Sequence, residues 1–191
     1  MDESLAKIRH ERSVKDFPGV SFRDDEYVEY AFSRAKICLW GILIATFVGL
    51  VMILLAFLLV LLAQEQLDDM GRRFLFIVLF ALLGAAIIIC LVATKIYNGN
   101  RLFITNKRAI QLIMNTIVSS SVNVIDLSSI EDASFRQDTI IQRLFHYGTL
   151  RLATVGDETT YTFKYSDISP EELKGVSRLI SIAKKSMRKD G

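Results

Sequence analysis

The chain has 191 residues, of which 51% are hydrophobic, and a formal net charge of +2. This length has room for a pair of membrane spans and one small domain of about a hundred residues. Residues 95–191 carry fourteen Lys/Arg against ten Asp/Glu, which is too mild an excess to indicate binding to nucleic acid. We therefore expect no nucleic-acid partner.

Two long apolar segments, 37–63 and 74–94, stand close together in the first half of the chain. Each reaches the length of about 20 residues that crosses the hydrocarbon core of a bilayer, and neither contains Asp, Glu, Lys, Arg or Pro. A core helix of a soluble protein rarely stays apolar around its whole circumference over this length. The polar connector QEQLDDMGRR (64–73) is short. The sequence thus predicts a transmembrane helical hairpin over 37–97.

Basic residues near the ends of the spans predict the orientation of the hairpin. The connector contains two basic residues, Arg72 and Arg73, whereas six Lys or Arg residues lie near the spans on the side of the two termini. This bias favours both termini in the cytoplasm and an inner (plasma) membrane location. The first span starts too far into the chain for a secretory signal peptide. The six residues are Arg34, Lys36, Lys95, Arg101, Lys107 and Arg108.

Small residues recur at four-residue spacing in both spans. Gly41, Ala45 and Gly49 share one face of the first span, and Ala81 and Ala85 share one face of the second. Small residues let helix backbones approach closely in lipid, so we expect the spans to pack on each other along these faces. A dimer interface along the same faces is the alternative. Neither span contains an ionisable residue, which favours an anchor over a transporter.

The segment before the spans, 1–36, is polar and mixed in charge, and we interpret it as a loosely ordered cytoplasmic arm. Tyr27, Tyr30 and Phe32 lie at the approach to the first span. Because aromatic side chains with polar edges favour the headgroup zone, they predict an interfacial lead-in to the membrane.

After residue 97 the sequence changes to short strand-like segments separated by turn residues. A turn at 156–158 between two alternating segments gives the strongest hairpin signal. Residues 138–145 indicate a short helix that begins at Asp138 and carries apolar side chains at 140, 141, 144 and 145. The predicted strands are 101–105, 109–114, 117–125, 130–137, 149–154 and 159–165.

The last predicted element is an amphipathic helix. Ser169 suits the N-cap, Pro170 the first helical position, and Glu172 completes a capping box. A strand-rich segment followed by one helix predicts an α+β domain in which the helix closes one end of a bent antiparallel barrel. The apolar stripe of this helix is Leu173, Val176, Ile180, Ala183 and Met187.

Three strings in this region, RLFITNKRAI (101–110), VIDLSSIEDASFRQD (124–138) and IIQRLFHYGTLRLAT (140–154), resemble the bacterial pleckstrin-homology-like domain of the YdbS/YdbT (DUF304-like) type. The chain departs from that pattern at Asp126, where Pro is frequent, and at His146, where Gly is frequent. The resemblance implies a PH-like domain over 98–191, a bent antiparallel β-barrel or sandwich capped by a C-terminal α-helix. It also implies the two-span anchor that commonly precedes this domain. A shared scaffold does not carry a shared activity.

Several residues of these strings have structural interpretations. Asn106 suits a tight turn, and Gly148 suits a turn that needs a positive φ. Leu144 and Tyr147 are interpreted as core residues. We expect most of the motif to specify the fold rather than to contact a ligand.

No constellation of residues indicates catalysis or a cofactor. His10 and His146 lie in different regions, and HExxH, GxSxG, Walker-type and GxGxxG motifs are absent. Cys38 and Cys90 both lie in the spans; palmitoylation of Cys38 is a minor alternative to simple packing. We therefore expect a protein that is not an enzyme and has no cofactor or bound metal. The carboxylates Asp24, Asp25, Glu26 and Glu29 are interpreted as a solvated acidic face, with a divalent-ion site as the alternative.

The remaining candidate is a binding surface formed by Lys95, Arg101, Lys107 and Arg108. Relatives by fold often hold phosphoinositides with basic residues flanking the first hairpin, although the usual spacing is missing here. Basic residues beside a span also set topology and attract anionic lipid without specific recognition. Three further basic residues offer a second surface: Arg136, Arg143 and Arg151.

These observations predict a membrane-anchored, non-catalytic PH-like module. Its expected partners are anionic lipid headgroups or a protein or peptide at the cytoplasmic membrane face, with self-association through the hairpin as a further possibility. The alternative is an accessory subunit of a larger membrane enzyme or transporter complex. Small-residue faces left exposed after the hairpin has packed would favour that alternative.

Overall fold

The computed structural model of the protein describes residues 3–62, 68–154 and 160–190, with side chains for all of these except 3 and 187–190. The chain divides into two compact units. The first unit combines Met1–Ala35 with Asn98–Gly191, and the second is Lys36–Tyr97. We call them the α+β unit and the hairpin unit.

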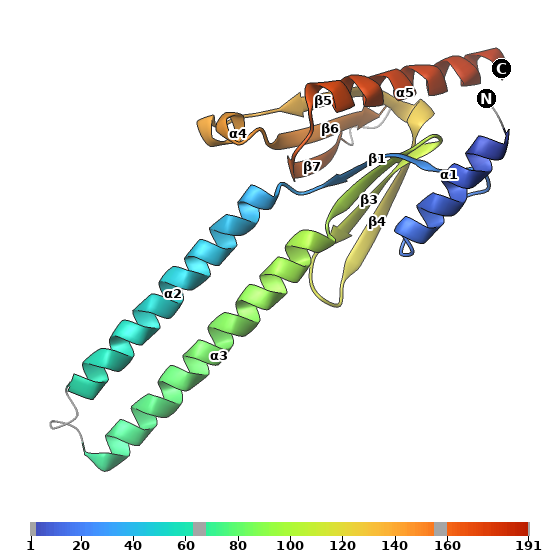
Figure 1. The fold of residues 1–191 in the computed structure, drawn as a ribbon. Helices are drawn as coiled ribbons and strands as arrows, with labels where there is room; N and C mark the ends of the chain where they lie inside the picture. The colour runs from blue at the N-terminus through green and yellow to red at the C-terminus, as the bar shows by residue number, and fades with distance from the viewer. Residues whose placement is uncertain (1–2, 63–67, 155–159, 191) are drawn as a thin grey trace. The chain divides into compact units, whose positions relative to one another are not determined.

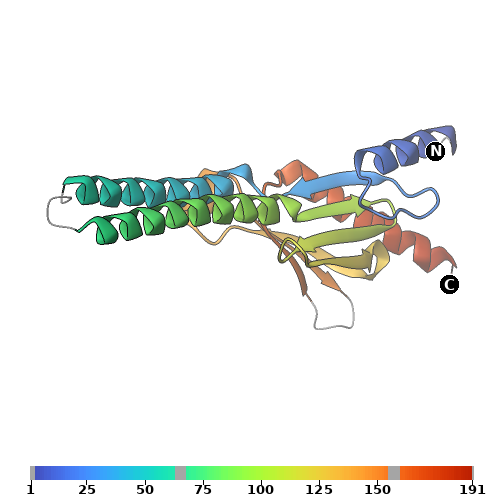
Figure 2. The ribbon, with the colours of Figure 1, turned by 90° about the horizontal axis from the view of Figure 1, so that it is seen from below.

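The hairpin unit is built from helices α2 (Lys36–Leu62) and α3 (Asp69–Gly99), which lie side by side (Figures 1 and 2). Both are long and apolar enough to cross a membrane. In the most apolar 18-residue stretch of each helix, only 0% and 6% of the residues are buried. This exposure distinguishes them from the core helices of a soluble protein. The predicted pair of span-length helices is confirmed. Residues 64–67 of the predicted connector and residue 63 of the predicted first span lie outside the described residues.

The α+β unit contains two antiparallel sheets. The first has the order β1-β2-β3-β4 and the second the order β5-β6-β7. An isolated bridge between Arg34 and Ser166 joins β1 to the end of β7, and the short helix η2 (Leu127–Ser129) connects β4 to β5. The strands are β1 (Val28–Ser33), β2 (Arg101–Thr105), β3 (Arg108–Met114), β4 (Ser120–Asp126), β5 (Ile130–Arg136), β6 (Gly148–Thr154) and β7 (Thr160–Ser166).

The core of this unit lies between the sheets and under the C-terminal helix α5 (Pro170–Asp190). Alternate residues of the strands point inward, as the pleat requires. Ile104 and Leu150 are fully buried, and Val176 and Ile180 of α5 pack against the same cluster. Two apolar helices, two antiparallel sheets and a C-terminal helix are the predicted α+β fold class, which is confirmed.

The N-terminal segment differs from the predicted loose arm. It forms helix α1 (Glu3–Asp16) and strand β1. Strand β1 pairs with β2, which follows the two spans in the sequence. The Phe17 ring packs on Phe103 with centroids 4.7 Å apart. Tyr27 and Phe32 are 3% and 4% exposed, so they are core residues and not the predicted interfacial lead-in. Local patterns could not show this pairing, because the partner strand lies about seventy residues further along the chain.

Most predicted strands agree with the structure to within a few residues. The short helix is α4 (Ile140–Leu144), and its N-cap is Thr139 rather than Asp138. Strand β4 begins at Ser120, so residues 117–119 belong to a turn. The predicted hairpin turn at 156–158 and the side chain of Met187 lie outside the described residues.

Candidate functional site

A buried ion pair connects the segment before the spans to the β2–β3 hairpin. The Glu26 side chain is fully buried, and the Arg108 guanidinium donates to both of its oxygens, with Nε–Oε1 at 2.8 Å and Nη2–Oε2 at 2.9 Å. The Thr105 hydroxyl donates to Glu26 Oε1 (2.7 Å) and the Arg23 amide to Oε2 (2.8 Å). The Arg108 Nη2 also donates to the Ser21 carbonyl (2.7 Å). We call this arrangement the Glu26 clamp.

The electrostatics of the clamp favour an ionised Glu26. Burial alone raises the pKa of this carboxyl, but hydrogen bonds from Arg108, Arg23 and Thr105, together with the Arg108 charge, outweigh that effect. The net result is a pKa below the ordinary value for glutamate. Glu26 therefore belongs to a structural ion pair and not to the solvated acidic face that its neighbours suggested.

The turn next to the clamp is held by further long-range hydrogen bonds. Asn106 accepts from the Tyr27 amide (3.1 Å) and donates to the Asp25 carbonyl (3.1 Å), while Lys107 Nζ donates to the Asp24 carbonyl (2.7 Å). Two of the predicted binding residues, Lys107 and Arg108, thus hold the N-terminal segment in place. Their separation from that segment by more than eighty residues hides this role from sequence patterns.

Within the α+β unit, Arg101 lies apart from Lys107 and Arg108. Arg101 is exposed and pairs with Ser33, which lies three residues before α2 begins. Lys107 and Arg108 lie at the other end of β2, about 13 Å away at 3.3 Å per residue. Lys95 is exposed on α3 and belongs to the hairpin unit. We call the end marked by Ser33, Arg34, Arg101 and Ser166 the span-adjacent end, and the end marked by the 106–107 turn and η2 the far end.

A groove of about 560 Å³ lies at the far end, between α5 and the turn at 106–107. Leu179, Ile182 and Ala183 form its apolar side; Ile182 is 52% exposed. Glu29 and Lys107 place opposite charges on the other side. This groove was not predicted from the sequence, although Leu179, Ile182 and Ser186 follow a second stripe of helical spacing on α5. The remaining lining residues are Tyr27, Asn106, Ser128 and Ser186.

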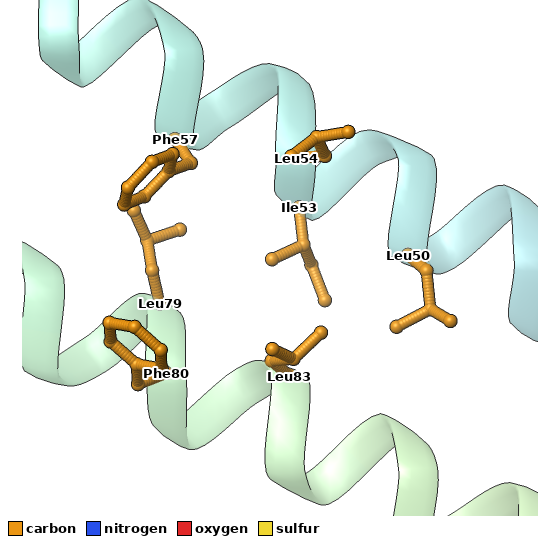
Figure 3. A pocket seen from close by; sticks show the side chains of 7 residues that line it. All are labelled: Leu50, Ile53, Leu54, Phe57, Leu79, Phe80 and Leu83. Carbon is orange, nitrogen blue, oxygen red and sulfur yellow. The ribbon is translucent and has the colours of Figure 1, made fainter.

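In the hairpin unit the spans contact each other through large side chains. The rings of Phe57 and Phe76 are 5.3 Å apart, and apolar residues of both helices line a pocket of about 190 Å³ (Figure 3). A Cβ added at Gly41 or Gly49 meets nothing within 4 Å. The pocket is lined by Leu50, Ile53, Leu54, Phe57, Leu79, Phe80 and Leu83.

The small-residue faces therefore do not form the contact between the two spans that we expected. Ala45, Ala81 and Ala85 are also exposed. Large Leu, Ile and Phe side chains of both helices lie between α2 and α3 instead. The dimer alternative stays a prediction.

The described part of the chain contains no group of three or more His, Cys, Asp or Glu side chains that could hold a metal ion. His10 uses Nδ1 to donate to the Glu26 carbonyl (2.6 Å), which ties α1 to the clamp. His146 is exposed and has a φ of 55° at the end of α4. The two histidines thus lie in separate structural settings.

Comparison with protein-family models and with curated proteins gave no match. Among solved structures, the chain is similar to a DUF1696 family protein with a pleckstrin-homology domain from Shewanella loihica PV-4. The identity is 15%, the match covers 44% of this chain and 70% of that one, and the TM-score is 0.33.

Proposed function

We propose that this protein is a membrane-anchored, non-catalytic adaptor, in which the hairpin crosses the bilayer and the PH-like α+β unit binds a segment of a protein partner. Both termini then lie in the cytoplasm. The observation that carries the proposal is the groove at the far end. It combines an apolar helix face with a pair of opposite charges, the composition of sites that bind short peptide segments.

The position of the groove supports this function. Both connections of the α+β unit to the hairpin lie at the span-adjacent end, whereas the groove lies at the far end of the unit. Lys107 and Arg108 are bound to the N-terminal segment, which disfavours them as the lipid site. The expected occupant is a segment with one or two apolar side chains that cover Leu179 and Ile182, flanked by charge.

Photo-crosslinking tests the groove in the native membrane. A benzophenone amino acid at Ile182 should capture a partner, whereas the same probe at Ser181, an adjacent exposed residue outside the groove lining, should not. The captured segment, made as a peptide, should bind the full-length protein in micelles. We expect Ile182→Asp to weaken binding at least about tenfold, because burying an Ile side chain contributes about 1.5–3 kcal/mol. Equal effects of Ser181→Asp would contradict the groove.

An accessory-subunit role is the second candidate, and the exposed small-residue faces favour it. The hairpin does not use Gly41 or Ala45 for its own contact, which leaves them free to pack against a helix of another subunit. We expect Gly41→Leu with Ala45→Leu to release the protein from a larger complex in native electrophoresis of mild-detergent extracts. The control is Ile44→Leu with Val51→Leu, at exposed positions outside that face. Unchanged migration of both variants would contradict this role.

A further inference from the structure

The span-adjacent end of the α+β unit is defined by its own hydrogen-bonded pairs. Ser33 pairs with Arg101 in the first sheet, and Arg34 bridges to Ser166, which in turn pairs with Gly148. The chain enters α2 directly after residues 33–35 and returns from α3 directly before Arg101. Any element next to Gly148 therefore lies close to both connections to the spans.

Helix α4 lies next to Gly148 and exposes a concentrated group of large apolar side chains. Ile140, Ile141, Leu144 and Phe145 are 85%, 60%, 68% and 48% exposed. Leu144 was predicted to be a core residue; that prediction is wrong, because α4 projects from the end of its sheet instead of covering it (Figure 1). Such a cluster is unusual on a surface that faces only water.

Hydrogen bonds hold the backbone of α4 in place, so the fold fixes the position of the exposed apolar group. Thr139 and Gln142 form a capping box at its start. Gln137, which directly follows β5, donates from Nε2 to the carbonyls of Gln142 in α4 (3.1 Å) and of Tyr147, just before β6 (3.2 Å). A segment fixed in this way presents its apolar side chains in one defined direction.

A second apolar projection lies at the same end. The turn between β3 and β4 carries Ile117 and Val118, which are 48% and 98% exposed. The turn is closed by hydrogen bonds such as Asn115 N to Ser119 O (3.0 Å). It follows Met114, whose amide donates to the side chain of Asn100 (3.3 Å), one residue before β2 begins. The turn thus extends past the start of β2, beside the return from α3.

Cations and tyrosines lie between these two projections. The Arg34 guanidinium lies over the ring of Tyr165 at 6.0 Å, and the rings of Tyr165 and Tyr147 are 6.4 Å apart. Tyr165 is 42% exposed, and Arg101 and Arg143 are exposed at the same end. Exposed apolar side chains flanked by tyrosines and basic residues match the chemistry of the headgroup zone, where acyl chains meet anionic and polar groups.

We propose that α4 and the β3–β4 turn insert their apolar side chains into the headgroup layer of the same bilayer that α2 and α3 cross. The inference rests on the proposed membrane anchoring, and it adds a lipid contact that the spans alone do not provide. A lipid surface is favoured over a protein partner because both projections flank the connections to the spans. The contact fixes the α+β unit against the membrane and leaves the groove at the far end accessible.

Tryptophan fluorescence of the full-length protein in liposomes tests the contact. The chain contains a single tryptophan, Trp40, in α2. In a Trp40→Phe background, Leu144→Trp and, separately, Val118→Trp each place the fluorophore on one projection. Ile182→Trp is the matched control, an exposed apolar position at the far end. With lipids brominated on their upper acyl carbons, we expect quenching and a blue shift at 144 and 118, and neither at 182.

The outcomes separate the lipid contact from the membrane anchor. Quenching at 144 or at 118 above the Ile182→Trp control supports the proposal. Quenching of native Trp40 without quenching at 144 or 118 overturns the lipid contact and leaves the anchor intact. Absence of quenching at Trp40 overturns the anchor and the contact with it. Leu144 and Val118 are already exposed, so we expect circular dichroism spectra equal to that of the Trp40→Phe parent.

Discussion

At the scale of single residues, the most informative feature is the Glu26 clamp. It joins residues that are 82 positions apart, with Arg108 only 12% exposed and Glu26 fully buried. A buried ion pair of this kind contributes little when compared with an apolar replacement, but losing one partner leaves an uncompensated charge. Specific registration of the N-terminal segment on the β2–β3 hairpin is the structural consequence that we assign to the pair.

Replacing Glu26 by Gln should destabilise the α+β unit. We expect a loss of about 3–5 kcal/mol in the free energy of unfolding, because the Arg108 charge stays buried without its partner. Hydrogen exchange of the β2 and β3 amides in micelles measures this loss. Glu29→Gln is the matched control, since Glu29 forms a solvent-accessible ion pair with Arg9 at 3.6 Å, and its loss should cost less than about 1 kcal/mol. Equal effects of the two substitutions would contradict the clamp.

The same residue predicts a pH dependence of stability. Because the pKa of Glu26 is lowered in the folded state, its contribution is complete above the ordinary glutamate value of about 4.3. The contribution disappears as the pH falls from there through the lower folded pKa. Thermal unfolding followed by circular dichroism between neutral and acidic pH should show a shallower decrease in midpoint for Glu26→Gln than for the parent. Parallel curves would show that the clamp carboxylate does not titrate in this way.

At the scale of elements, Gly148 shows how a residue can be singled out correctly for the wrong reason. The sequence suggested a positive φ, but that conformation occurs two residues earlier, at His146 with φ 55°. Glycine is required at position 148 because the backbone of Arg136 and the ring of Phe135 lie too close for a Cβ atom. A Cβ there would lie 2.5 Å from the Arg136 carbonyl oxygen and 2.8 Å from Phe135 Cζ.

Gly148→Ala should therefore strain the junction of β5, α4 and β6. The obstructing atom belongs to the backbone, so relief requires movement of a strand, with a cost of about 1–3 kcal/mol. Urea unfolding of the full-length protein in micelles, read from far-UV dichroism, measures the change. Gly19→Ala is the control, because an added Cβ there meets nothing within 4 Å. A Gly148→Ala protein as stable as the control would show that the strands adjust freely.

The strands and helices themselves were largely predictable, because alternation and capping are local. The box of Ser169 and Glu172 at the start of α5 is present, with the Ser169 amide donating to Glu172 Oε2 at 2.8 Å. Local periodicity finds an apolar face but not what covers it, so Leu144 was placed in the core and Ile182 was overlooked. The Glu26 clamp was not predicted because Glu26 precedes the two spans in the sequence and Arg108 follows them. Lys107 and Arg108 were predicted as binding residues, but local sequence patterns do not reveal their hydrogen-bond partners in the N-terminal segment.

At the scale of the whole molecule, the α+β unit is formed by the chain segments that precede and follow the hairpin in the sequence. The predicted boundary placed the domain at 98–191, whereas the compact unit also includes Met1–Ala35. Strand β1 completes the first sheet, and Phe32 belongs to the common core. The hairpin is thus an insertion between two strands that pair directly, so the domain needs the chain segments that precede and follow the hairpin in the sequence.

This arrangement predicts how the protein can be divided. A fragment of residues 98–191 should not fold, because it lacks β1, exposes the edge of β2 and leaves Arg108 without Glu26. Joining residue 35 to residue 98 with a linker of roughly four Gly and Ser residues should restore a folded domain, because Ser33 and Arg101 are already paired neighbours. Dispersion of backbone amide signals in NMR spectra distinguishes the two. Well-dispersed spectra from the 98–191 fragment would show that β1 is dispensable, and a disordered linked protein would show that the domain needs its hairpin.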